Sequence, residues 1–348
     1  MNELTLPLTP REAAKELLAT LPAKRMREVV ERRFGLKGGR RQTLEEIGQS
    51  YKITRERVRQ IEADAMRRLR QAALGLLEDF FRPIASAVRM RGEVMAEQGL
   101  LSLFAQRRWH PHLRLLLNSA GCLHFVPESD LYHAHWAVSP SAAANTQEIM
   151  RCVVGWLSEK GRPADKAVLH QFISSLEQGN AAERGDSPAA DSYIGISRLI
   201  AVNPFGEYGL ITWPAITPRG IKDKAHAVLA KAGEPMHFRQ VAAAIDKVGW
   251  GKNKKKAHPQ TVHNELIKDE RFVLVGRGLY ALREWGYEPG TVRDVLASLL
   301  KSSRLPLERD EIIRLASQKR MVKPQTILLN LQDRSLFKRT DDGRYTLV

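Results

Sequence analysis

The sequence has few cysteines and no long apolar segment. Only Cys122 and Cys152 occur among its 348 residues, too few for a disulfide framework, and this fits a reducing compartment. No stretch approaches the roughly eighteen uninterrupted apolar residues of a membrane span. The N-terminal residues MNELTLPLTPREAAKELL also lack the basic start and apolar core of a signal peptide. These absences argue against secreted and membrane-spanning proteins, and we expect a cytosolic, nucleoid-associated one.

Motifs for catalysis and for metal or nucleotide binding are also lacking. No G-x-x-x-x-G-K-[ST] phosphate loop occurs, and no carboxylate pair is followed by a spaced lysine on a strand. Cys122, His124, His133 and His135 lie close together without a zinc-type spacing, and solvent-facing histidines of a hairpin explain them as well. The acidic pair at 310–311 falls near the start of a predicted helix, where it favours the dipole. We expect no enzyme activity, no metal and no cofactor.

Positive charge is what the chain has in excess. It carries 55 Lys+Arg against 39 Asp+Glu, a net charge of +16 and a pI near 10.0. Such a chain is attracted to polyanions, and salt weakens that attraction strongly. A membrane surface is the rival polyanion, but the apolar segments that would support it are missing. Nucleic acid is therefore the expected partner.

The segment TLEEIGQSYKITRERVRQIEADAMRRLR, residues 43–70, has the pattern of two helices around a tight turn. Thr43 and Glu46 stand three residues apart, as in a capping box that opens a short helix. Residues 51–53 form the predicted turn, and Thr54 can cap the second helix. This order of cap, short helix, turn and cap predicts a helix-turn-helix that binds double-stranded DNA.

The second helix of this motif separates apolar and polar faces. Its apolar residues recur at spacings of three and four, as in a buried stripe: Val58, Ile61, Ala65 and Leu69. The first two turns carry the polar residues that would meet a major groove: Arg55, Glu56, Arg57, Arg59 and Gln60. Arg67, Arg68 and Arg70 follow, where they could contact phosphates. The alternative is a solvated arginine-rich helix, but the joint occurrence of caps and turn favours DNA recognition.

Residues 21–71, from LPAKRMREVVERRFGLKGGRRQTLEEIG to ITRERVRQIEADAMRRLR, resemble region four of bacterial primary-type sigma factors. The resemblance implies recognition of the upstream promoter hexamer and contact with the flap of the RNA polymerase beta subunit. It assigns base contacts to Arg55, Glu56, Arg59 and Gln60, places Thr43, Leu44 and Arg57 near the backbone, and gives Val29, Val30 and Phe34 a supporting role before a loop at Gly35 and 38–39. The residues before Leu21 hold no aromatic-rich melting region, so we expect the chain not to be a complete initiation factor.

The rest of the sequence repeats one pattern at a spacing of roughly seventy residues. Each copy reads as three helices followed by a hairpin, which is a winged helix. We therefore predict a mainly α protein with a helix-turn-helix domain at 1–73 and four winged-helix-like units with small wings, at 76–138, 146–214, 219–286 and 290–348. A small-residue connector is expected at 137–146, and a polar loop at 178–191. The NPFGEYG motif from Asn203 predicts a tight wing or a partner-binding loop.

The copy at 221–285 has the clearest pattern. A helix ends at Gly233, a second helix is reached through Pro235, a third starts near His258, and a hairpin has Gly276-Arg277-Gly278 at its tip. Alternation predicts a shared apolar side for Phe272, Leu274, Tyr280, Leu282 and Trp285.

This copy resembles the HARE-type helix-turn-helix through AHAVLAKAGEPMHFRQVA and TVHNELIKDERFVLVGRGLYALREW. The family occurs in the delta subunit of some bacterial RNA polymerases, in chromatin-associated proteins and in some restriction systems. Beside the third helix lies the densest run of positive charge, Lys252, Lys254, Lys255 and Lys256. These lysines are either a solvated loop or phosphate contacts. Arg277 could enter a minor groove, unless the glycines alone make the turn.

The sequence thus predicts a DNA-binding transcription regulator that reads promoter-like DNA through the helix after Thr54, with the winged units adding DNA or polymerase contacts. One alternative is a polymerase-associated protein that competes with sigma factors for the beta flap. Another is the non-catalytic DNA-binding part of a restriction or defence system. The oligomeric state stays open at this point.

Overall fold

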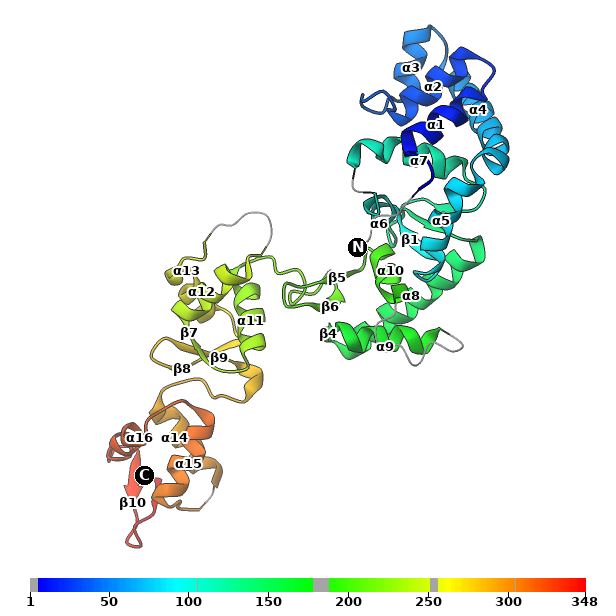
Figure 1. Cartoon of the computed structure of the whole chain (residues 1–348). Coiled ribbons are helices and arrows are strands. Elements are labelled where there is room, and N and C mark those ends of the chain that lie inside the picture. The colour runs from blue at the N-terminus through cyan, green and yellow to red at the C-terminus, as the bar shows by residue number, and fades with distance from the viewer. Residues whose placement is uncertain (1–5, 105, 178–187, 251–255, 304) are drawn as a thin grey trace. The chain divides into compact units, whose positions relative to one another are not determined.

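Helices dominate the computed structural model, which describes residues 6–104, 106–177, 188–250, 256–303 and 305–348 (Figure 1). The strands form small sheets of two or three members. The predicted mainly α fold, a helix-turn-helix followed by tandem winged-helix-like units, is confirmed. By compactness the chain divides into two units, Met1–Ala201 with Tyr208–Ile211 and Val202–Glu207 with Thr212–Val348. The boundaries predicted for the five domains stay a prediction.

Four helices open the first unit: α1 (Pro10–Ala19), α2 (Lys24–Phe34), α3 (Leu44–Tyr51) and α4 (Arg55–Leu76). A capping box between Thr9 and Glu12 begins α1. Gly35, in the left-handed region at φ 71°, ends α2. Tyr51 belongs to α3, so the turn between α3 and α4 starts one residue later than predicted.

A winged helix follows α4 in the same unit. Its elements are α5 (Glu78–Arg89), β1 (Val94–Ala96), α6 (Glu97–Ser102), the 3-10 turn η1 (Arg107–Trp109), α7 (His110–Ser119), β2 (His124–Val126) and β3 (His135–Ala137). The strands lie in the order β1-β3-β2, and Trp136 of the central strand pairs with Met95 on one side and Phe125 on the other. The Trp136 side chain is buried, so it anchors this sheet.

One hydrophobic core joins the first four helices to this winged helix. Leu17 of α1 and Leu69 of α4 belong to the same buried cluster as Leu113, Leu116 and Leu117 of α7. Helix α7 packs against α1, α2 and α4. Burying five leucines at about 1.5–3 kcal/mol each is a large stabilising term, so the helix-turn-helix and the winged helix fold as one body.

A second winged helix completes this unit: α8 (Pro140–Lys160), β4 (Ala164–Asp165), α9 (Lys166–Leu176), α10 (Pro188–Ile196), β5 (Ile200–Val202) and β6 (Glu207–Leu210). Its third helix, α10, packs against β1 of the preceding winged helix. Gly92, at φ 85°, makes this contact possible, because a Cβ there would lie 2.5 Å from the Ala189 Cβ and 2.8 Å from Cε1 of Tyr193.

The small-residue connector predicted at 137–146 is wrong. Helix α8 already begins at Pro140, and the Ser139 hydroxyl caps it by accepting a hydrogen bond from the Ala142 backbone at 3.1 Å. Alanine is the strongest helix former, and Ala142, Ala143 and Thr146 are buried, so tertiary packing stabilises the segment as helix. Of the loop predicted at 178–191, residues 178–187 lie outside the described residues, and 188–191 begin α10.

The second unit holds two more winged helices. The first contains α11 (Ile221–Ala232), β7 (Met236–His237), α12 (Phe238–Val248), α13 (Pro259–Lys268), β8 (Phe272–Gly276), β9 (Leu279–Leu282) and the 3-10 turn η2 (Arg283–Trp285). The second contains α14 (Val292–Ser303), α15 (Arg309–Lys319), α16 (Pro324–Leu331), β10 (Phe337–Arg339) and β11 (Tyr345–Leu347). Each has its own apolar core.

The β8–β9 hairpin differs from prediction in one residue. Phe272, Tyr280 and Leu282 are buried in the core of their unit, but Leu274 is 43% exposed. The opposite face of the hairpin is buried instead at Val273 and is covered by Leu279, Trp285 and Tyr287. Simple alternation assumes one buried face, and this hairpin has two. Pro235 precedes the short strand β7, which sequence analysis missed because it has two residues.

The NPFGEYG motif forms a tight turn. The Asn203 side-chain oxygen accepts hydrogen bonds from the backbone of Phe205 and Glu207, both at 3.0 Å, and Gly206 adopts φ 81°. An asparagine that bonds its own loop in this way closes the turn without help from a partner.

An ion cluster ties two ends of the 221–285 winged helix together. The Arg271 guanidinium donates to Asp269 at 2.7 Å and to Asp223 of α11 at 2.9 Å. Side-chain hydrogen bonds from Arg271 lower the pKa of Asp269 to about 2. Because this folded-state pKa lies below the ordinary value of 3.8, the cluster stabilises the fold above about pH 4, and this contribution is lost as pH falls towards 2.

We expect Asp269→Asn to lower the free energy of unfolding by about 1–3 kcal/mol at neutral pH, since hydrogen bonds to a charged group are lost. The difference from wild type should shrink as pH falls below about 4. Urea unfolding followed by circular dichroism measures both. Glu270→Gln, an exposed neighbour, is the matched control. Equal stability of Asp269→Asn and this control at neutral pH would contradict the assigned role.

Candidate nucleic-acid interface

Two side-chain caps set the geometry of the helix-turn-helix. The Thr43 hydroxyl accepts from the Glu46 backbone at 3.2 Å, and the Glu46 carboxylate accepts from the Thr43 backbone at 2.8 Å. The Thr54 hydroxyl accepts from the Arg57 backbone at 3.2 Å and begins α4. The predicted capping box and the second cap are both confirmed.

The turn between α3 and α4 is very tight. Lys52 takes the left-handed conformation at φ 54°, and the Ile53 backbone donates to the Gly48 carbonyl at 3.0 Å. A Cβ on Gly48 would lie only 2.8 Å from the Ile53 carbonyl oxygen. Glycine is therefore required at this position by the close approach of the two helices. Below the turn, Val29, Ile47 and Val58 form a small separate core.

The polar face of α4 carries an ordered set of side chains. Arg55, Glu56, Arg57, Arg59 and Gln60 are all exposed. Arg59 donates two hydrogen bonds to the Glu56 carboxylate, both at 2.8 Å, and these bonds lower the pKa of Glu56. Arg57 donates to Gln60 at 3.1 Å. Neighbouring donors and acceptors thus hold one another in place on the surface, which reduces the conformational entropy lost on binding.

A hollow of about 510 Å³ lies at the start of both helices and is lined by Arg33, Thr43, Leu44, Glu45 and Arg55. The structure therefore brings together three of the predicted contact residues, Thr43, Leu44 and Arg55. Free backbone N–H groups at helix N-termini favour anions. With two arginines beside them, they suit a phosphate of a nucleic-acid backbone.

Arg33 was not singled out from the sequence, yet it fixes this surface. Its side chain donates to Glu62 of α4 at 3.0 Å and to the Gln42 carbonyl at 2.8 Å. The connection before α3 is thereby held to α4. No local signal marks this role, because Glu62 lies 29 residues away in the sequence.

The predicted phosphate contacts farther along the chain are exposed. Arg67 pairs with Asp64 on the same helix. In the second unit, Lys256 and Arg277 of the wing tip are exposed, while Lys252, Lys254 and Lys255 lie outside the described residues. The Gln260 backbone donates to Nδ1 of His258 at 3.3 Å, so a histidine caps α13.

The first two winged helices do not present their third helices to solvent. In a winged helix this element normally enters the major groove. Here α7 is packed against α1, α2 and α4, and α10 is packed against β1. Leu113 and Leu116 of α7 and Ala190 and Ile196 of α10 are fully buried. The surface open to DNA in the first unit is therefore that of the helix-turn-helix.

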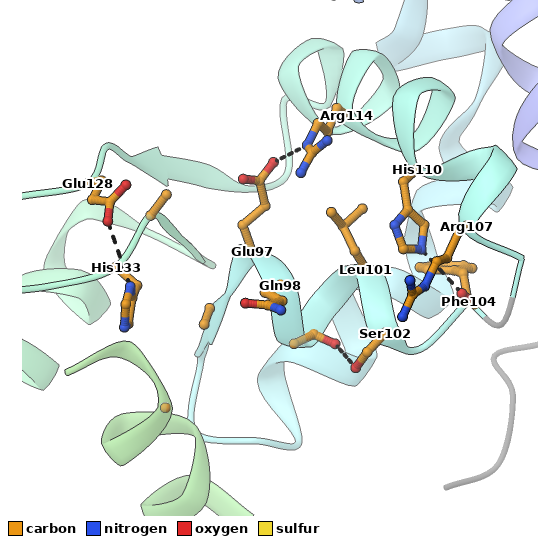
Figure 2. A pocket seen from close by; sticks show the side chains of 14 residues that line it. Glu97, Gln98, Leu101, Ser102, Phe104, Arg107, His110, Arg114, Glu128 and His133 are labelled. Carbon is orange, nitrogen blue, oxygen red and sulfur yellow. Dashed lines mark hydrogen bonds and ion pairs between the residues drawn. The ribbon is translucent and has the colours of Figure 1, made fainter. Parts of the chain in front are cut away.

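Figure 2 shows the largest hollow of the first unit, about 1030 Å³, between α6, α7 and the β2–β3 connection. Glu97 points to Arg114 at 2.9 Å, and Glu128 lies 3.8 Å from Nδ1 of His133. Its charges are mixed and paired within the chain. This hollow lacks the excess of positive charge that a nucleic-acid site needs.

The expectation that the hairpin histidines face solvent is wrong for His135. Its side chain is buried, and burial lowers the pKa of the imidazole. Nδ1 lies 2.7 Å from the His133 carbonyl oxygen. The reason is its position in the central strand β3, covered on both edges by β1 and β2. His124 and His133 are exposed.

Comparison with known proteins identifies both predicted helix-turn-helix segments. Residues 17–71 match the family described as Sigma-70, region 4. The chain carries a sigma-70 region 4 domain. Residues 219–285 match the HARE-HTH family, described as a restriction endonuclease HTH domain that also occurs in ASXL proteins, so the HARE-type resemblance is confirmed as well. Both matches are of helix-turn-helix types and support DNA binding.

The relatives of the sigma-70 region 4 domain are sigma factors. RNA polymerase sigma factor SigA1 of Synechococcus elongatus is 55% identical over 60 residues, 17% of this chain and 15% of that protein. SigA of Microcystis aeruginosa is 55% identical over 60 residues, 17% of this chain and 14% of that protein. SigA of a Bacillus species is 45% identical over 83 residues, 21% of this chain and 22% of that protein. The chain thus spans under a quarter of these relatives' length. Among the described residues, none of the helices combines the length and the apolar character of a membrane span.

We expect Gly48→Ala to destabilise the sigma-70 region 4 domain by about 1–3 kcal/mol, because the new methyl group meets backbone that cannot move freely. Gly75→Ala is the matched control. Gly75 lies in α4, and a methyl group added there would have no neighbour within 4 Å, so this change should stabilise the helix by about 0.5–1 kcal/mol. Thermal unfolding of both variants measures the difference. Equal melting temperatures would refute the close approach at Gly48.

Proposed function

We propose that this protein is a DNA-binding transcription regulator that reads a promoter-like sequence through the exposed face of α4. The observation that carries the proposal is the ordered set Arg55, Glu56, Arg59 and Gln60 beside the basic hollow at the start of α3 and α4. Arginine and glutamine recognise base edges in a major groove, while the hollow suits the backbone. Its mechanism is binding rather than catalysis.

The downstream units have different parts in this proposal. The winged helices built on α7 and α10 support the reader as one body. The HARE-type unit, with Lys256 and Arg277 exposed, adds a second, weaker DNA contact. Linked weak sites raise affinity through effective concentration. The protein acts in the cytoplasm, on the nucleoid.

The surface of the sigma-70 region 4 domain favours DNA over polymerase as the main partner. Among described residues 6–71, no large apolar side chain is exposed, whereas a groove for a partner helix needs apolar anchors. The apolar sides of α1 and α4 are already covered by α7. A polymerase-associated protein that grips the beta flap stays the alternative, favoured by the match to sigma factors.

Selection from random duplex DNA by the whole chain at near-physiological salt tests the proposal. We expect enrichment of a short sequence that resembles a promoter hexamer. Arg59→Ala/Gln60→Ala should abolish the enrichment, because each lost base contact costs about 1–3 kcal/mol of discrimination. Residual binding that depends on salt should remain.

Gln71→Ala/Arg82→Ala, which also removes one exposed arginine and one exposed glutamine, is the matched control and should select the same sequence as wild type. Binding without any enriched sequence would refute a sequence reader. Capture of core RNA polymerase that survives Arg59→Ala/Gln60→Ala would then support the alternative.

A further inference from the structure

A second basic cleft lies in the first unit, away from the exposed face of α4. It is formed by α1, by α2 with the connection that follows it, and by η1 and α7. Two adjoining hollows of about 830 and 360 Å³ make up the cleft. Both are lined by Arg11, Lys15, Leu36, Lys37 and His112. A cleft of this size holds a phosphate-bearing ligand rather than a water molecule.

Positive charge in the cleft exceeds negative charge. The cations are Arg11, Lys15, Arg27, Lys37 and Arg108, and the acids are Glu12 and Glu31. Both acids are engaged. Glu12 accepts from the Thr9 backbone at 3.0 Å in the capping box, and Glu31 pairs with Lys37 at 2.7 Å. Arg11 and Lys15 have no ion pair within the described part of the chain.

Arg27 adds a donor that nothing satisfies. Its Nε–H is buried and lacks a hydrogen-bond partner among the described residues. A buried donor of this kind costs free energy unless an acceptor reaches it. Arg27 lines the smaller hollow together with His112, so an acceptor placed there would be an oxygen of a water or of a bound anion.

His112 senses the same excess of charge. Burial and the nearby Arg11 both lower the pKa of its imidazole, against a backbone hydrogen bond to Arg108 that raises it. The other charged groups that line the hollows beside it are Lys15, Arg27, Glu31 and Lys37. An anion in the cleft would offset this repulsion.

We propose that this cleft binds phosphate groups, and that in the DNA complex these are backbone phosphates flanking the sequence read by α4. The connection between α2 and α3 favours the backbone as the source. It supplies Lys37 to the cleft and Thr43 to the hollow at α4. Six residues span at most roughly 22 Å, a length that a few nucleotides of one strand cover. Only this choice of source rests on the proposed function.

Salt dependence of DNA binding tests the proposal. Arg11→Ala/Lys15→Ala removes two exposed cations, and Lys24→Ala/Arg82→Ala removes two exposed cations elsewhere in the same unit. On a duplex that extends beyond the selected sequence, the first variant should reduce the slope of log Kobs against log salt by about 1–2, as expected for one or two lost phosphate contacts. The control should keep the wild-type slope. The enriched sequence should be the same for all three proteins.

A second arm uses inorganic triphosphate and thermal unfolding. A rise in the melting temperature of wild type and control, absent from Arg11→Ala/Lys15→Ala, with no difference in slope, would identify a free phosphate ligand as the source. An unchanged slope together with no triphosphate effect overturns the cleft. If no sequence is enriched but the slope on plain duplex still falls in this variant, the cleft stands and the proposed sequence reader fails.

Discussion

The apolar contact of α7 with α1, α2 and α4 is the constraint on which the first unit depends. It places the sigma-70 region 4 domain and the following winged helix around one core, through Leu17, Leu69 and Leu113. The side of the domain turned away from the α4 polar face is thereby removed from solvent. What stays exposed is polar and basic. The same contact brings Arg108 and His112 to α1, so the basic cleft exists only because α7 packs there.

The DNA-reading surface combines rigid backbone with charged side chains that already pair. Gly48 and Lys52 set the turn, and Val58 packs under it. Arg33 holds the connection before α3 against α4. A surface fixed in this way loses little entropy on binding and can spend its interactions on discrimination between bases.

Sequence patterns predicted what is decided locally. The capping box at Thr43, the cap at Thr54 and the exposed residues of α4 depend on neighbours within a few positions, and the structure has them. The glycine turns of the wings are local as well. Contacts between distant segments were not predictable. Arg33 meets a partner 29 residues away, and α10 is buried by a strand from another winged helix.

The incorrect predictions have the same cause. The alanine-rich segment before Thr146 looked like a connector, and burial of Ala142 and Ala143 makes it the start of a helix. His135 looked like a surface histidine, and two flanking strands bury it. Leu274 looked like core, because the second apolar face of its hairpin has no separate sequence signature. Each error concerns which side of an element meets a neighbour.

The shared core also limits how the protein can be dissected and how it can diverge. A fragment that ended at residue 73 would expose Leu17, Val30 and Leu69, an apolar stripe that favours aggregation. The reader therefore cannot be detached from the winged helix behind it and stay soluble. In evolution, the residues of α7 are free to vary only as core residues vary, while the α4 polar face can change one base contact at a time and give regulators with new target sites on an unchanged scaffold.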